Sequence, residues 1–490
     1  MRWTVEEVAG ALGVAPPERL DPLARVAGVS IDSRAVRPGE LFFAIRGPRH
    51  DGHSFVADAL AAGALAGVVA RQLAGEYPEA VQARLFTVED TLAALQQLAR
   101  RVSRAWREAR PGRRLAAVTG SAGKTTTKEI LAALLAARFR ILKSEGNLNN
   151  DYGLPLTLMR LEDEDAVVVE LGMSRRGELA RLATIAQPEV GVVTNVAPVH
   201  LEFFSSLDEI ALAKRELIDG LAGPQPVAVL NADDPRVSRF AKGFRGRVLT
   251  FGTSPGAMFR AEGIEDRGAE GSAFRFVAPA GRARLELPLV GRHNVHNALA
   301  ALAAASEWGI GAEGARSVFA GLKPASMRGE VLRFEEGFSV INDSYNSNPV
   351  ALASMTQLLA ATPGHRRRIL AAGEMLELGP ASHELHREAG RTAARLENIG
   401  WIFGVGGDAA ELVRGAVEAG HPKDQAQFFS SSQEAATFLA EFIIRGDLLL
   451  VKGSRGVRME KIVEALRAKH LLKDERTAGE TVTTARPERH

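Results

Sequence analysis

The sequence predicts an α/β protein with three domains: a small N-terminal α/β domain, a central doubly wound domain, and a second, smaller α/β domain. The chain has 490 residues, too many for one hydrophobic core. Two long blocks alternate β-branched apolar runs with helical patterns, which is typical of parallel sheets covered by helices. In the string AVTGSAGKTTTKEIL (117–131), an apolar run ends at a glycine and a helix follows a small-residue loop. Such a loop indicates a phosphate-binding P-loop-type domain.

The first predicted domain comprises residues 1–87. It opens with an amphipathic helix in MRWTVEEVAGALGV, and GVSIDSRAVRPGELFFAIRG contains strand pieces broken by Pro-Gly and Arg-Gly turns. A second helical pattern, TLAALQQLARRVSRAW (91–106), then leads to the phosphate loop.

The central predicted domain comprises residues 88–323. Continuous β-branched runs predict buried parallel strands. These runs are at 115–119, 166–171, 190–196 and 226–231. Helical patterns between them form βαβ units, and after residue 250 short β-rich pieces precede a helix in NVHNALAALAAASEWG.

The third predicted domain comprises residues 324–470, and residues 471–490 form a polar, aperiodic tail that we expect to be disordered. Strands are predicted in FSVINDS, RRRILAAG, WIFGVGG and DLLLVKGS. Helices are predicted from about 350, from about 382, near 408, and after the last strand.

The composition excludes several classes of function. There are 61 basic and 59 acidic residues, so nothing resembles the basic stripe of a nucleic-acid-binding protein. The absence of cysteine excludes disulfides, thiolate nucleophiles and cysteine-ligated zinc. The longest apolar stretch, at 59–70, is too short and too rich in Ala and Gly to span a membrane, and the N-terminus lacks the apolar run of a signal peptide. We therefore expect a soluble cytoplasmic protein.

The phosphate loop has the form T-G-x-x-G-K-T. It is tighter than the common G-x-x-x-x-G-K-[ST] pattern, because position 118 is Val. The predicted phosphate-binding residues are Gly120, Ser121, Ala122, Gly123, Lys124, Thr125 and Thr126. Lys124 can reach the β- and γ-phosphates of a nucleotide, and the Thr125 hydroxyl can bind Mg²⁺. The alternative, a Gly-rich turn with a surface lysine, is disfavoured by the strand before it and the helix after it.

Other candidates allow two interpretations each. Glu170 ends a strand, where it can bind Mg²⁺ or interact with a helix dipole. His200 follows the next strand, but Mg²⁺ prefers oxygen, so chemistry alone does not make it a ligand. Asn294 and Asn297 can cap a helix or pair with an adenine edge. Asp343 can bind a ligand at a strand end or belong to an Asx-rich turn.

Four stretches, together with the phosphate loop, resemble the Mur ligases over residues 1 to about 470. They are DSRAVRPGELFFAIRGPRHDGHSFV, SEGNLNNDYGLPLTL, DSYNSNP and GEMLELG. The resemblance implies an ATP- and Mg²⁺-dependent amide ligase of peptidoglycan precursor synthesis. The best match is to the branch that adds D-alanyl-D-alanine to UDP-N-acetylmuramoyl-tripeptide through an acyl phosphate. The D-N-P-R motif of the branch that adds the third residue is absent.

The resemblance also implies a role for each domain and for individual residues. The first domain binds the UDP end, the second binds ATP, and a Rossmann-like third domain closes over the site. The implied metal ligands are Thr125, Glu170, His200 and Lys214, with Lys214 carbamylated. The implied nucleotide contacts beyond the loop are His293, Asn294, Asn297, Arg328 and Asp343, with Arg328 reaching the γ-phosphate. The implied substrate contacts are Ser33, Arg34, Asn147, Tyr345, Asn346 and Asn348.

At two residues the sequence pattern and the family resemblance differ. The helical pattern around Lys214 alone predicts an exposed lysine. Ser347 stands where the family often has Ala, and because serine is small we expect no effect.

Two other functions remain as alternatives. One is another amide ligase of the superfamily, such as a folylpolyglutamate-type enzyme, which lacks the UDP-binding domain. The other is a P-loop switch, which needs no amine acceptor. The sequence predicts a monomer without nucleic-acid partners, and it leaves open whether the third peptide residue is lysine or diaminopimelate.

Overall fold

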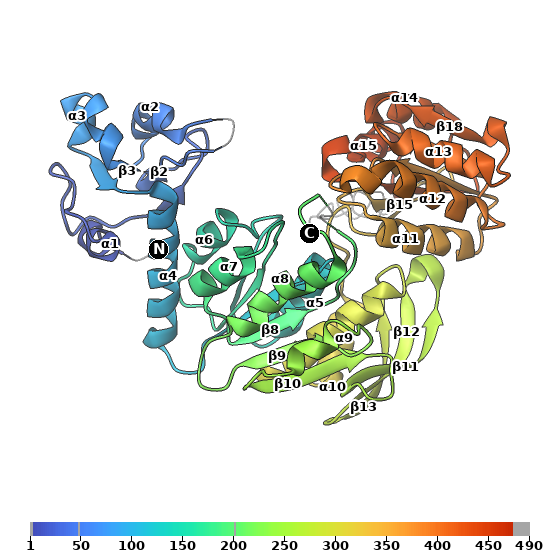
Figure 1. The fold of residues 1–490 in the computed structure, drawn as a ribbon, viewed down its shortest axis with the longest axis horizontal. Coiled ribbons are helices and arrows are strands. Elements are labelled where there is room, and N and C mark those ends of the chain that lie inside the picture. The colour runs from blue at the N-terminus through green and yellow to red at the C-terminus, as the bar shows by residue number, and fades with distance from the viewer. Residues whose placement is uncertain (1–2, 48–49, 200–201, 474–490) are drawn as a thin grey trace, which may run out of the picture.

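The chain folds into three β-sheets that follow one another along the sequence. The computed structural model describes residues 3–47, 50–199 and 202–473. The sheets have four, nine and six strands. Figure 1 shows the nine-stranded sheet between the other two, with the N-terminal and C-terminal sheets raised on either side of it.

The N-terminal sheet is entirely parallel. Its strands are β1 (Gly28–Ser30), β2 (Glu40–Phe43), β3 (Ala66–Ala70) and β4 (Leu85–Val88), in that spatial order. Its helices are α1 (Val5–Leu12), α2 (Val56–Ala61) and α3 (Glu79–Gln82). The helix α1 begins at a capping box, in which Thr4 and Glu7 each bond the other's backbone N–H.

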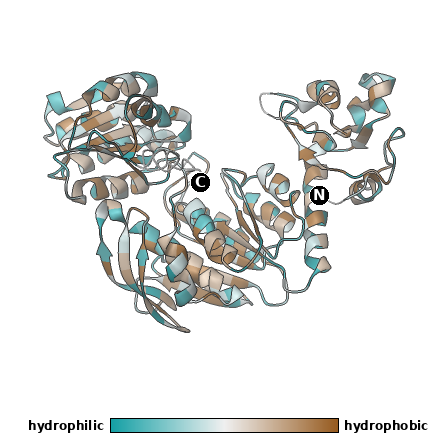
Figure 2. Cartoon of the chain, turned by 180° about the vertical axis from the view of Figure 1, so that it is seen from behind, coloured by the Kyte–Doolittle hydropathy of each residue, from teal (hydrophilic) through white to brown (hydrophobic). Residues whose placement is uncertain are grey.

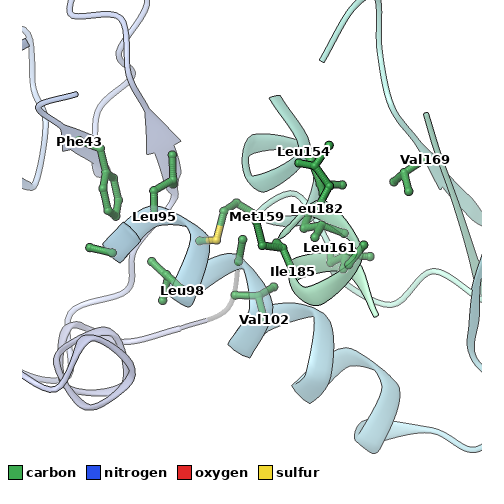
Figure 3. Close-up of a cluster of buried hydrophobic side chains, with 14 of the residues drawn as sticks. Phe43, Leu95, Leu98, Val102, Leu154, Met159, Leu161, Val169, Leu182 and Ile185 are labelled. Carbon is green, nitrogen blue, oxygen red and sulfur yellow. The ribbon is translucent and has the colours of Figure 1, made fainter. Parts of the chain in front are cut away.

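The long helix α4 (Thr91–Ala109) connects the first sheet to the second. Its apolar stripe belongs to one hydrophobic cluster that extends into both sheets. Figure 3 shows Phe43 on one side of this helix and Met159 and Ile185 on the other. Because the N-terminal and central sheets both bury apolar residues against α4, this helix joins the two sheets.

The central sheet combines a parallel, doubly wound part with an antiparallel extension. The strands are β5 (Arg114–Thr119), β6 (Ile141–Lys143), β7 (Ala166–Glu170), β8 (Val190–Val193), β9 (Val227–Asn231), β10 (Arg247–Gly252), β11 (Phe259–Asp266), β12 (Ser272–Ala278) and β13 (Gly281–Leu287). Their order is β13-β12-β11-β10-β9-β8-β5-β7-β6, and only the β11–β12 and β12–β13 pairs are antiparallel. The four strands predicted in this block are present as β5, β7, β8 and β9.

Helices cover both faces of the central sheet. They are α5 (Lys124–Ala136), α6 (Gly153–Leu158), α7 (Glu178–Ala186), α8 (Leu207–Asp219), α9 (His293–Ala305) and α10 (Ala312–Ala320). The strands between these layers are buried on both faces, as continuous β-branched runs predict. Figure 2 shows hydrophobic residues concentrated in these strands and along α4.

The C-terminal sheet is parallel except for one edge strand. Its order is β14-β15-β19-β16-β17-β18, and β14 pairs antiparallel with β15. The strands are β14 (Glu330–Arg333), β15 (Ser339–Asp343), β16 (Arg367–Gly373), β17 (Trp401–Val405), β18 (Ala426–Phe429) and β19 (Asp447–Lys452). The helices are α11 (Pro349–Ala361), α12 (Ser382–Ala394), α13 (Ala409–Glu418), α14 (Ser432–Phe442) and α15 (Glu460–Lys469).

The end of the described chain is part of the C-terminal sheet domain. The predicted tail begins within the fold, because Phe334 forms a bridge with Leu472, while residues 474–490 lie outside the described residues. Among the described residues, no helix is long and apolar enough to cross a membrane.

Candidate active site

A cavity of about 680 Å³ lies between the central and C-terminal sheets. One wall comes from the loop before α5, the end of β7 and the start of α9. The other wall comes from the ends of β15 and β19, the start of α11 and the loop after β16. Both walls contain the carboxyl ends of parallel strands, where α/β sheets bind ligands.

Most of the predicted site residues line this cavity. They are Ser121, Ala122, Gly123, Lys124, Thr125, Thr126, Asn147, Glu170, His293, Asn294, Asn297, Arg328, Asp343, Tyr345, Asn346 and Asn348. Gly120, Lys214, Ser33 and Arg34 are not among the residues that line it. His200 lies outside the described residues.

The phosphate loop needs glycine at both of its glycine positions. A Cβ on Gly120 would lie 1.8 Å from Thr194 Oγ1, and a Cβ on Gly123 would lie 2.1 Å from Asn297 Oδ1. Gly123 also has a φ of 81°, in the left-handed region that favours glycine. The loop can therefore approach Thr194 and Asn297 this closely only because glycine has no side chain.

The loop presents a cluster of backbone donors at the start of α5. The N–H groups of Ser121 and Ala122 donate to the backbone oxygen and to Oδ1 of Asn195, at 3.0 and 2.9 Å. The N–H groups of residues 123 to 126 have no acceptor within the described part of the chain. Together with the helix dipole, these four donors create a positive potential that can attract an anion.

Lys124 folds back over this loop. Its Nζ donates to the Gly120 carbonyl oxygen at 3.0 Å. Burial lowers the pKa of Lys124, the negative charge of Glu170 opposes this shift, and the positive charge of Arg328 adds to it. The lysine is thus placed beside the backbone donors, where its positive charge can face a phosphate.

Glu170 is held by two donors at the end of β7. The Thr125 hydroxyl donates to its Oε2 at 2.7 Å, and Asn149 Nδ2 donates to its Oε1 at 2.8 Å. The side chain is buried, so the carboxylate has one defined orientation. Asn149 was not predicted as a site residue, although it belongs to the stretch SEGNLNNDYG.

The residues around Glu170 fit a magnesium ion better than a softer metal. The described residues contain no group of three or more His, Asp or Glu side chains that could hold a metal ion by themselves. Mg²⁺ is commonly bound by one or two protein oxygens together with substrate phosphates and water. The Thr125 hydroxyl and the Glu170 carboxylate lie beside the anion-binding loop and offer such oxygens.

Lys214 is buried, which corrects the prediction of an exposed helix lysine. It lies on α8 with 1% of its surface exposed. Burial, and then the positive charge of Lys124, lower its pKa well below the ordinary value. The helical position explains the burial, because Lys214 lies four residues after Ile210 and three before Leu217, both of which are buried.

The asparagines of α9 bond one another rather than cap the helix. Asn297 Nδ2 donates to Asn294 Oδ1, and Asn294 Nδ2 donates to the Val290 carbonyl oxygen, both at 2.8 Å. Arg292 occupies the N-cap position without a side-chain hydrogen bond, so the helix-capping interpretation is wrong. Both side chains remain at the cavity wall beside the phosphate loop.

The opposite wall is organised by Lys452, which the sequence did not indicate. Its Nζ donates to Asp343 Oδ2 at 2.5 Å and to the Asn346 carbonyl oxygen at 2.9 Å. Asp343 and Lys452 face each other in the register of β15 and β19. Asn348 caps α11, because its Oδ1 accepts from the Ala351 N–H at 2.9 Å.

Arg328 lies over an aromatic ring of this wall. Its guanidinium carbon is 4.1 Å from the ring centroid of Tyr345, a favourable cation–π distance. Arg455, another unpredicted lining residue, is 6.0 Å from the same centroid. The two arginines and Lys124 give the cavity several positive groups that can neutralise phosphate.

The predicted UDP contacts belong to the N-terminal sheet. The Arg34 side chain is 87% exposed and pairs with both carboxylate oxygens of Asp32, at 2.9 and 2.8 Å. This side-chain hydrogen bond lowers the pKa of Asp32 to about 2. His53 of the stretch DGH is structural, because its Nε2 accepts from the Ala70 N–H and its Nδ1 faces Asp51.

Three family models match consecutive parts of the chain. The model described as Mur ligase family, catalytic domain, matches residues 25–103. The Mur ligase middle domain matches residues 118–305, and the Mur ligase glutamate ligase domain matches residues 327–455.

Curated relatives match almost the whole chain. The UDP-N-acetylmuramoyl-tripeptide–D-alanyl-D-alanine ligase of Bacillus subtilis is 34% identical over 440 residues, covering 90% of this chain and 93% of the relative. The enzyme of that name from Escherichia coli is 35% identical over 444 residues, covering 89% and 93%.

Solved structures agree with these matches. A MurF crystal structure from Acinetobacter baumannii superposes with a TM-score of 0.85 at 30% identity, covering 96% of this chain and 99% of that one. MurF from Thermotoga maritima in complex with ADP superposes with a TM-score of 0.77 at 30% identity, covering 90% and 97%. A folylpolyglutamate synthase from Mycobacterium tuberculosis, at 18% identity, shares the fold alone.

Proposed function

Because the chain belongs to the Mur ligase family, we propose that it joins D-alanyl-D-alanine to UDP-N-acetylmuramoyl-tripeptide at the expense of ATP, in peptidoglycan precursor synthesis. The observation that carries this proposal is the cavity with a phosphate loop on one wall and the DSYNSNP and GEMLELG loops on the other. A hydrolytic switch needs no second wall of this kind. The N-terminal sheet, with the DSR stretch after β1, separates the proposal from a folylpolyglutamate-type activity.

The chemistry requires that a carboxylate be activated before an amine can attack it. In the proposed reaction the terminal carboxylate of the tripeptide attacks the γ-phosphorus of ATP, forming an acyl phosphate and releasing ADP. The amine of D-alanyl-D-alanine then attacks the acyl carbonyl. The tetrahedral intermediate loses phosphate and a proton, leaving the amide. The protein supplies position and charge neutralisation rather than a covalent group.

Each wall has a separate part in this reaction. The four free N–H groups at the start of α5 and Lys124 would hold the ATP phosphates. Arg328, whose guanidinium is fixed over the Tyr345 ring, would add charge at the γ-phosphate. His293, Asn294 and Asn297 line the end of the cavity formed by α9, where we place the adenine.

We propose that Thr125 and Glu170 hold Mg²⁺ together with the phosphates. When bound, Mg²⁺ would withdraw charge from the transferring phosphoryl group. Thr125 can keep donating its proton to Glu170 while its oxygen lone pairs face the ion, since the 2.7 Å bond uses only the hydrogen. His200 remains a further predicted ligand from family resemblance.

We propose that Lys214 acts as a carbamate. An unprotonated amine reacts with CO₂, forming an N–C bond and losing a proton, and burial favours the unprotonated form. Lys214 has no hydrogen-bond or ion-pair partner among the described residues, so a carbamate would not displace an existing contact. The carbamate would replace a buried amine by a negatively charged, carboxylate-like group close to Lys124.

The remaining assignments complete the proposed substrate path. Ser33 and Arg34 would contact the UDP end within domain 1–87, residues 88–323 would form the ATP domain, and residues 324–470 the closing domain. Asn147, Tyr345, Asn346 and Asn348 would line the peptide and dipeptide side of the cavity. We further propose that the enzyme works as a cytoplasmic monomer that uses small-molecule substrates.

The decisive experiment measures ATP turnover with UDP-muramoyl peptides of two and three residues, with lysine or diaminopimelate at position three. Each peptide is offered with D-alanyl-D-alanine, with glutamate, or with no amine. The proposal expects phosphate release and a pentapeptide product only with a tripeptide and D-alanyl-D-alanine. Amine-independent phosphate release, or a preference for glutamate, would contradict it.

A further inference from the structure

Lys128 is a completely buried lysine of the phosphate-loop helix α5. It lies about one turn after Lys124, with 0% of its surface exposed. Unlike Lys124, it is not among the residues that line the cavity. Burying an ammonium group costs free energy unless the group is paired and hydrogen-bonded, so the position of Lys128 requires an explanation.

An ion pair with Glu129 accounts for only part of this burial. Lys128 Nζ lies 2.9 Å from Glu129 Oε1. The other carboxylate oxygen of Glu129 accepts a hydrogen bond from Lys143, whose side chain is 41% exposed. Burial raises the pKa of Glu129, but hydrogen bonds from Lys143 and Lys128 outweigh this effect and hold the pKa below its ordinary value. Because Glu129 keeps Lys143 as a partner, its charge does not by itself require a second, buried lysine.

The other contact of Lys128 is with the first residue of the stretch SEGNLNN. Its Nζ donates to the Ser144 carbonyl oxygen at 2.7 Å. Ser144 directly follows β6 and is itself buried. Its N–H donates to the Val168 carbonyl oxygen at 3.1 Å, and its Oγ accepts from the Glu170 N–H at 2.8 Å. Lys128 therefore holds the residue that holds the backbone of Glu170.

These bonds close a network around Glu170. Thr125 of α5 donates to one of its carboxylate oxygens, and Asn149 of the SEGNLNN stretch donates to the other. Ser144 bonds its backbone N–H, and Lys128 connects Ser144 to α5. The helix that carries Thr125 and the loop that carries Asn149 are thus joined at Lys128.

We infer that Lys128 is a positioning residue of the magnesium site, which bonds Ser144 and thereby fixes Glu170 and Asn149 relative to α5. This inference rests on the proposed function, in which Thr125 and Glu170 hold Mg²⁺. Loss of Lys128 weakens nucleotide binding that needs the metal ion. Binding that does not need the ion is spared, because the backbone donors of residues 123–126 lie at the start of α5 itself.

The test is calorimetry of Lys128→Met with a non-hydrolysable ATP analogue, in the presence and in the absence of Mg²⁺. Methionine cannot donate to Ser144, and Glu129 keeps its bond to Lys143. With Mg²⁺ present we expect the affinity for the analogue to fall about tenfold, as when other residues that orient a metal ligand are replaced. Without Mg²⁺ the affinity should stay within twofold of wild type. A loss of equal size under both conditions, or no loss with Mg²⁺ present, overturns the inference.

Ser144→Ala tests the next bond of the network in a chain that keeps Lys128, so it also serves if Lys128→Met does not fold. It removes the oxygen that accepts from the Glu170 N–H, and it should show a loss confined to binding with Mg²⁺. Because both residues act through one series of bonds, the double variant Lys128→Met/Ser144→Ala should lose less binding free energy than the two single variants added together. Additive losses, or a Ser144→Ala variant that binds like wild type, contradict this series of bonds.

Lys143→Met is the matched control. It removes the other lysine that bonds Glu129 but leaves the bond from Lys128 to Ser144 in place. Its affinity for the analogue should stay within twofold of wild type with and without Mg²⁺. A loss specific to Mg²⁺ in this control would assign the effect to the charge of Glu129 and overturn the role of Ser144. A wild-type enzyme that binds the analogue equally well with and without Mg²⁺ overturns the proposed magnesium site instead.

Discussion

Replacing Lys452 by methionine tests whether one ion pair supports the C-terminal wall. The lysine is 3% exposed and Asp343 is 17% exposed, so Lys452→Met leaves a largely buried carboxylate without its partner. Removing one partner of a buried pair costs about 3–5 kcal/mol, and the residual exposure of Asp343 places the loss at about 3 kcal/mol. In a domain of this size, 1 kcal/mol corresponds to about 2–4 °C, so the melting temperature should fall by about 6–12 °C.

The double variant Asp343→Asn/Lys452→Met separates charge from packing. If the cost lies in the orphaned carboxylate, the neutral double variant should recover about half of the loss or more. Thermal unfolding followed by circular dichroism measures both variants, with Lys469→Met as control, because Lys469 pairs with Glu441 on the surface and should cost less than about 1 kcal/mol. A double variant as unstable as the single variant, or a single variant no worse than the control, would refute the reasoning.

Three further predictions concern the central domain. Lys124→Ala should lower kcat for ATP-dependent ligation by about 10²-fold or more, because a charged group beside the phosphate donors is lost, and steady-state kinetics that stay near wild type would contradict this role. Asn149→Ala removes a hydrogen bond that orients Glu170, so the affinity for a non-hydrolysable ATP analogue should fall in the presence of Mg²⁺. Calorimetry should show no change in that affinity when Mg²⁺ is absent. Lys214→Ala should be nearly inactive and partly restored by a short-chain carboxylic acid, whereas full activity in CO₂-depleted buffer would exclude a carbamate.

The parts of the fold that the sequence predicts are those with local signals. The strands β5, β7, β8 and β9 are continuous apolar runs, and α4 has a clear amphipathic period. The missed strands β6, β14 and β18 have three or four residues each and lie at sheet edges, where burial no longer imposes a pattern. Edge strands are therefore recognised only once their neighbours are in place.

The same distinction between local and long-range signals explains which site residues could be predicted. Phosphate-loop residues are contiguous, so one string predicts them together. Asn149 and Lys452 act on residues 21 and 109 positions away, and no spacing in the sequence indicates such pairs. Lys214 had a usable signal, since it falls on the buried stripe of α8, but a lysine in a helix is ordinarily assigned to the surface.

The two walls of the cavity are each held together by their own hydrogen bonds. Thr125 and Asn149 fix Glu170 within the central domain, and Lys452 fixes Asp343 and the Asn346 loop within the C-terminal domain. Direct contact between the domains is also made away from the cavity, where Arg333 pairs with Glu270 near the turn between β11 and β12. Because neither wall depends on the other for its internal geometry, a rotation of the C-terminal domain can narrow the cavity without rearranging either set of ligands. Under the proposed function, Arg328, on the segment between the two sheets, would meet the phosphates as the walls approach, so its contribution should depend on closure more than that of Lys124.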